Sequence, residues 1–295
     1  MNIRNVLAFA GFSTVLLTSC GDTATVESNS SLVKKDSTVQ DRTEKIENIF
    51  FNIPSPIETV NILKQAGATY EWNLPLDPMK LDEFTGISSK ALAMGIYGAD
   101  LNYASVFGQD NDMYMYLSCA EKLGNDLGMG QVFTKETTDR IEINVADKDS
   151  MQSIISETFW SMDAQLHDEG RESISALIIC GGWLEGVYLA TQLAVLNPNN
   201  EAIKQRIAEQ KYSIENLVKL LESYGDNDDL IEVTFNMKEL EELFQQITEE
   251  KKLTEGTVDE DGMPIIGQQI SLTMSDELLK EITQLISEIR VDYTY

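Results

Sequence analysis

Two acidic residues of this sequence stand alone in apolar stretches with helical periodicity. Asp100 and Glu185 are each followed three residues later by a tyrosine, Tyr103 and Tyr188, and Gln192 lies one helical turn beyond Tyr188. Two carboxyl groups in an apolar environment raise the pKa of at least one of them, which is how glycosidases and other acid–base enzymes obtain a proton donor. The same five side chains could instead bind a ligand or make structural hydrogen bonds. All three interpretations remain open, and no residue is predicted to be catalytic.

Other chemistries lack the residues that they need. The only histidine, His167, lies in a polar helix end, and no G-x-S-x-G motif is present, so a nucleophilic triad is disfavoured. One histidine with Cys119 and Cys180 does not make a usual zinc site, and no phosphate-binding or dinucleotide motif occurs. With 22 basic and 49 acidic residues the net charge is −27, which repels a phosphate backbone. We expect no metal, no cofactor and no nucleic-acid partner.

The segment 173–196, SISALIICGGWLEGVYLATQLAVL, must position Glu185. It is apolar on nearly every face of a helix, which is typical of a protein centre or a membrane. Its length permits a membrane span, but a carboxylate at the bilayer centre costs roughly 2.5–3.5 kcal/mol, and no basic cluster flanks the segment. Gly181 and Gly182 would let a neighbouring helix approach closely, or leave room for a ligand. A buried central helix is the preferred interpretation, with a membrane span as the alternative.

A carboxylate buried without a partner is very unfavourable. We therefore expect Glu185 to be buried and hydrogen-bonded to a tyrosine hydroxyl or to the backbone of another helix. Tyr188 is the nearest candidate in sequence, and Tyr97 and Tyr103 are the first candidates from elsewhere.

Helical periodicity dominates the body of the chain and is rarely replaced by two-residue alternation. The expected helices span 55–66, 88–107, 112–127, 134–146, 150–166, 173–196, 201–223, 229–248 and 275–289. Gly67 is the expected left-handed cap of the first of them. The segment 249–267 is predicted to be an exposed loop, followed by a short extended piece at 269–273. The pattern predicts an all-α fold, either a helical bundle or a helical-repeat array.

Similar motifs recur in similar order along the chain. The segment Gly98–Ala104 resembles Gly182–Ala190, and Arg140–Val145 resembles Leu230–Phe235. This order predicts two duplicated four-helix units, 88–166 and 173–289, around the buried central helix. Chance similarity between apolar helices is the alternative.

The N-terminus gives the most specific signal. Arg4 lies in a short polar region, an apolar stretch runs from Val6 to Leu17, and the sequence Leu-Thr-Ser-Cys ends at Cys20. This resembles the lipobox of bacterial lipoproteins, whose cysteine is lipidated and becomes the first mature residue, so that acyl chains anchor the protein in the membrane. An ordinary cleaved signal with an incidental cysteine is the alternative.

The predicted organisation is a signal peptide (1–19), a flexible tether (20–45) and a single helical domain (46–295). Cys119 and Cys180 are expected to be buried free thiols, although an exported compartment permits a disulfide.

Together with the lipobox, three segments resemble an uncharacterised family of helical lipoproteins from Bacteroidetes. They are IPSPIE (53–58), YGADLNYAS (97–105) and GGWLEGVYLATQ (181–192). The resemblance covers the body from about residue 50. It implies a cell-envelope location and a helical fold only, because the family carries no established activity.

The sequence thus favours a lipid-anchored cell-envelope protein, in the outer membrane by preference, that acts as a non-enzymatic binding or scaffold module for a small ligand or an envelope protein partner. An envelope hydrolase using Asp100 and Glu185 is the alternative, and a structural partner of a larger outer-membrane assembly is a third possibility.

Overall fold

The computed structural model describes residues 60, 63–144, 147–225, 227–258 and 264–295. Cys20, the signal peptide, the tether and most of the expected helix 55–66 lie outside these residues. Gly67 has the expected positive φ of 87°. In chain order the described elements are η1 (Pro78–Glu83), α3 (Ile87–Phe107), α4 (Asp110–Asp126), α5 (Lys135–Asn144), α6 (Lys148–Asp168), α7 (Glu172–Leu196), α8 (Glu201–Ser223), η2 (Asp228–Leu230), α9 (Ile231–Gln245), β1 (Thr248–Val258), β2 (Pro264–Thr273) and α10 (Asp276–Thr294).

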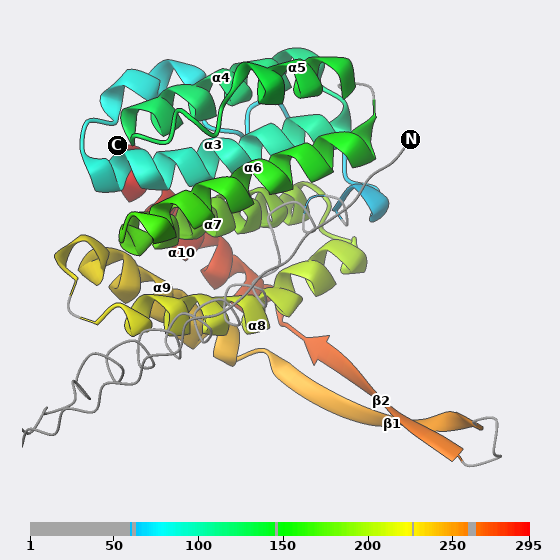
Figure 1. Cartoon of the computed structure of the whole chain (residues 1–295). Coiled ribbons are helices and arrows are strands. Elements are labelled where there is room, and N and C mark those ends of the chain that lie inside the picture. Colours follow the sequence, from blue (N-terminus) through cyan, green and yellow to red (C-terminus); the bar gives the residue numbers. More distant parts are fainter. Residues whose placement is uncertain (1–59, 61–62, 145–146, 226, 259–263) are drawn as a thin grey trace, which may run out of the picture. The chain divides into compact units, whose positions relative to one another are not determined.

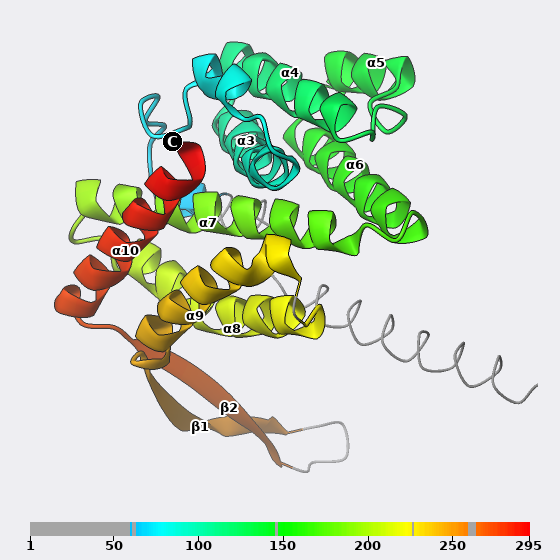
Figure 2. The same ribbon diagram turned by 90° about the vertical axis from the view of Figure 1, so that its left-hand side faces the viewer.

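The described residues confirm the all-α prediction, with one two-stranded sheet as the exception. Helix α7 is the centre of the domain and packs against α3, α6, α8 and α10 (Figures 1 and 2). Of its 25 residues, 18 are buried, which is why apolar residues occur on all its faces.

Helices α3 and α7 cross with their backbones in close contact. A Cβ atom on Gly95 would lie 2.0 Å from the carbonyl oxygen of Ile178, and one on Gly181 would lie 2.1 Å from that of Leu92. The space beside Gly181 is therefore filled by the neighbouring helix.

The contacts at this crossing are reciprocal. Gly181 of α7 lies against the backbone of α3, and Gly95 of α3 lies against the backbone of α7. In the same way, α6 packs on α7 and α10 packs on α3. Contacts of this kind occur around a twofold axis. The helix order α3–α6 and α7–α10 follows the proposed units 88–166 and 173–289, and the duplication remains a prediction.

The prediction of a loop over 249–267 is wrong. Strands β1 and β2 form an antiparallel hairpin with an irregular register between Thr254 and Thr257, and β2 packs on α8. The extended piece expected at 269–273 is the end of β2. The sequence of β1 is rich in charged residues and therefore did not predict a strand. Strand formation depends on the pairing partner more than on local composition.

Among the described residues, α7 is the one helix long and apolar enough to cross a membrane. Within its most apolar window, 89% of the residues are buried inside the domain. Length and composition alone do not separate a core helix from a membrane span, and this burial favours the core helix.

Candidate functional site

Glu185 is fully buried in α7 and forms a two-pronged ion pair with Arg290 of α10. Arg290 Nε donates to Oε2 at 2.5 Å and Nη2 donates to Oε1 at 2.7 Å. Each oxygen of Glu185 thus accepts a hydrogen bond from Arg290. The side chain of Glu185 is 0% exposed and that of Arg290 is 12% exposed. Such paired, charge-assisted hydrogen bonds are among the strongest in proteins.

Asp100 of α3 is the second carboxyl group of this cluster. Its Oδ2 accepts a hydrogen bond from the Leu76 N–H at 3.0 Å, whereas Oδ1 has no partner among the conventional donors of the described residues. Burial and then the neighbouring Glu185 carboxyl raise the pKa of Asp100 well above its usual value, and Arg290 offsets this only in part. We infer that folded Asp100 keeps its proton to a higher pH than a free carboxyl group does and that this proton faces Glu185, which explains the missing donor.

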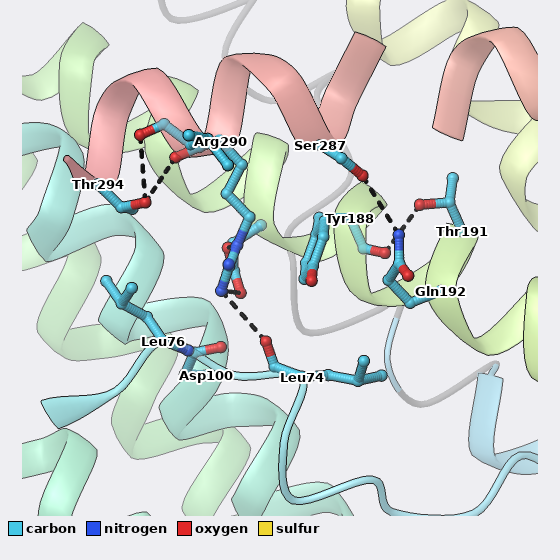
Figure 3. Close-up of polar contacts among 11 residues, drawn as sticks. Leu74, Leu76, Asp100, Tyr188, Thr191, Gln192, Ser287, Arg290 and Thr294 are labelled. Atoms are coloured by element: carbon cyan, nitrogen blue, oxygen red, sulfur yellow. Dashed lines mark hydrogen bonds and ion pairs between the residues drawn. The ribbon is translucent and has the colours of Figure 1, made fainter. Parts of the chain in front are cut away.

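Arg290 links α10 to two further groups. Its Nη2 also donates to the Leu74 carbonyl oxygen at 3.2 Å, and its Cζ lies 4.0 Å from the centre of the Tyr188 ring (Figure 3). Burial lowers the pKa of Arg290, but the Glu185 carboxylate raises it by more, so the guanidinium stays charged. With a proton on Asp100, the cluster of Asp100, Glu185 and Arg290 is therefore neutral overall.

The segment 69–77, here called the strap, crosses over this cluster. The two backbone contacts at Leu74 and Leu76 place it on Arg290 and Asp100, as Figure 3 shows. Tyr103 Oη accepts from the Glu71 N–H at 2.8 Å, and Tyr97 Oη donates to the Asp77 carbonyl at 3.0 Å. The polar side chains of α3 thus bind the strap.

The structure brings together only part of the predicted site. Glu185 and Tyr188 meet through Arg290, and Asp100 is close enough to Glu185 and Arg290 for their charges to shift its pKa. Tyr103 instead binds the strap, and Gln192 donates to Ser287 at 3.3 Å, away from the carboxyl groups. The burial expected for Glu185 is confirmed. The prediction that Glu185 binds a tyrosine hydroxyl or a helix backbone is wrong, because the Arg290 guanidinium donates to both carboxylate oxygens.

Arg290 was missed because the last helix was expected to end near Ile289, whereas α10 continues to Thr294. A signal was present in the sequence. Arg290 follows the buried residues Ile282 and Ile286 at four-residue spacing, so it is a single charge on an apolar helical stripe, as Glu185 is. Two such charges of opposite sign predict a buried ion pair.

Chemically, the cluster is a closed structural unit in this state. A general base must face the substrate, whereas both oxygens of Glu185 accept from Arg290 and Asp100 is 0% exposed. Cys119 and Cys180 are buried free thiols, as expected, and burial raises the pKa of Cys119 to about 11. Neither thiol is activated.

Asp100→Asn is expected to stabilise the protein, increasingly so as the pH rises. The amide matches a protonated carboxyl in shape, accepts from the Leu76 N–H and donates to Glu185. Because the pKa of Asp100 is raised in the folded state, its favourable contribution is complete below the unfolded pKa and is lost as the pH rises through the folded pKa. The expected gain at neutral to alkaline pH is about 1–3 kcal/mol, the penalty of an unsatisfied buried group.

Denaturant unfolding at several pH values measures this gain. Asp126→Asn is the control, because Lys90 lowers the pKa of this exposed carboxyl and the sign is reversed. A loss of stability in Asp100→Asn at alkaline pH would contradict the shared proton.

No protein-family model, curated protein or solved structure matches this chain.

Proposed function

We propose that the protein is a lipid-anchored cell-envelope protein that acts as a non-enzymatic binding or scaffold module. The proposal rests on one observation: other groups of the protein itself bind the carboxyl groups of the candidate site. Both oxygens of Glu185 are held by Arg290, and Asp100 is held by the strap. The acids therefore join α3, α7, α10 and the strap into one unit instead of facing a substrate.

The proposed anchor is lipid on Cys20. Helix α7 is enclosed by α3, α6, α8 and α10, which favours an anchor elsewhere in the chain. The lipobox-like sequence ending at Cys20 supplies such an anchor, and acyl chains bind membranes in proportion to their buried methylene groups. The likeness to Bacteroidetes lipoproteins supports the same proposal.

Cys20→Ala is expected to abolish acylation and to move most of the protein out of the membrane fraction or leave it unprocessed. Metabolic labelling with an acyl precursor and membrane fractionation measure both effects. Cys119→Ala is the matched control and should label as the wild type does. Label that persists in Cys20→Ala would overturn the anchor.

An envelope hydrolase is the second candidate, favoured by two adjacent carboxyl groups of which one has a raised pKa. The two proposals differ in what native envelopes should show. A scaffold is expected to give the same cross-linked partner with wild type and with folded Asp100→Asn. A hydrolase would lose turnover in Asp100→Asn, because that side chain no longer transfers a proton.

A further inference from the structure

The strap is held to the core by four bonds between its backbone and core side chains, by the hydrogen bond from Tyr70 to Asp112, and by the buried side chains of Leu74 and Leu76. Its backbone groups at 71, 74, 76 and 77 pair with Tyr103, Arg290, Asp100 and Tyr97, respectively. Three of these side chains come from α3 and one from α10. Segments with few regular backbone bonds open locally at lower free energy than the core does.

The strap lies on two buried carboxyl groups, of which Glu185 is paired with Arg290 and Asp100 is only influenced by the charge of Arg290. With a proton on Asp100 the cluster is neutral. Without it, two carboxylates face a single positive charge at two positions that are 0% exposed. A second buried negative charge is very costly unless water reaches it. The strap covers this site and belongs to no helix, so its opening would break no helix hydrogen bonds but would expose Leu74 and Leu76.

We propose that the strap is a pH-sensitive cover, closed while Asp100 and Glu185 share a proton and lifted when that proton is lost. Lifting it would expose Asp100, Tyr103 and Arg290 to solvent. This inference concerns the helical domain alone and does not depend on the lipid anchor.

The other groups around Asp100 keep their charge state while it titrates. Burial raises the pKa of Tyr97, Tyr116 and Tyr188 above the usual tyrosine value, that of Tyr103 to about 12, and that of Cys119 to about 11. These side chains stay neutral, and Arg290 stays charged. The groups that interact with Asp100 are Tyr97 and Tyr103 of α3, Tyr116 and Cys119 of α4, Glu185 and Tyr188 of α7, and Arg290 of α10, with Asp77 of the strap beside Tyr97.

Hydrogen exchange of the full chain, followed by mass spectrometry, tests the cover. Exchange rates are corrected for the intrinsic effect of pH and compared between about pH 5 and about pH 9. In the wild type we expect protection of the strap peptide to fall about tenfold or more with rising pH, while peptides from α7 keep theirs. Asp100→Asn should hold the strap closed throughout.

Two variants separate the proton from the contacts. Asp112→Asn is the matched control, because this carboxyl accepts from the strap residue Tyr70 at 2.7 Å without belonging to the cluster, and it should keep the wild-type pH response. Tyr103→Phe removes one strap contact and no charge, so protection near Glu71 should fall at every pH without a shift of the midpoint.

A wild-type profile that is flat in pH would overturn the proposal, as would an Asp100→Asn profile that opens as the wild type does. If Asp100→Asn does not fold, the wild-type and Tyr103→Phe profiles still decide: a midpoint that moves in Tyr103→Phe would assign the transition to the strap contacts and reject the shared proton.

Discussion

Replacing Arg290 by methionine is expected to cost about 3–5 kcal/mol of folding free energy, the usual result of removing one partner of a buried ion pair. The variant leaves Glu185 without its counter-ion in a site where it is 0% exposed, and the Leu74 carbonyl loses its donor. Domains of this kind are stable by only about 5–15 kcal/mol, so much of the stability is lost. Denaturant unfolding monitored by circular dichroism gives the difference.

The control is the same substitution at an exposed pair. Arg140 binds Glu157 with side chains 46% and 57% exposed, and Arg140→Met should cost at most about 1 kcal/mol. The double variant Arg290→Met/Glu185→Leu should recover most of the loss, because apolar groups replace both charges. Similar costs for Arg290→Met and Arg140→Met would show that the buried pair contributes little.

Gly181→Leu is expected to prevent the native packing of α7 on α3. The first side-chain carbon would lie 2.1 Å from the carbonyl oxygen of Leu92, and neither helix backbone can yield without separating the two central helices. Overpacking within a side-chain core costs about 1–3 kcal/mol, and a clash with backbone should exceed that range. The expected result is loss of cooperative thermal unfolding or insoluble expression.

Gly67→Ala is the contrasting control for this prediction. Gly67 has open space around its Cβ position but a φ of +87°, so the cost is the strain of a left-handed residue, about 1–2 kcal/mol. A folded Gly181→Leu protein with near wild-type stability would mean that the two helices are not in backbone contact.

Sequence periodicity was sufficient for most of the helices. The stretch 173–196 is apolar on all faces, and only a helix surrounded by other helices explains that pattern in a folded domain. The burial of Glu185 followed from its apolar neighbours in the same helix. The glycines at 181 and 182 indicated either close packing or room for a ligand, and the structure fills the space beside Gly181 with α3.

The tertiary structure determined which residues pair with the two buried acids. Arg290 is 105 residues from Glu185, and their pairing depends on how α10 packs on α7. The backbone groups of Leu74 and Leu76 carry no side-chain signal at all, so the strap could not be predicted as a cover of the acids. The β1–β2 hairpin was missed for a similar reason, since each strand is defined by hydrogen bonds to the other.

The sequence by itself thus determined the helical class, the central helix and the burial of Glu185, because these depend on periodicity and hydrophobicity within short segments. The tertiary structure alone decided that the acid is neutralised by an arginine and covered by the strap. Electrostatic pairing and backbone contacts join residues far apart in the chain, and only the packed arrangement of α3, α7 and α10 places them together.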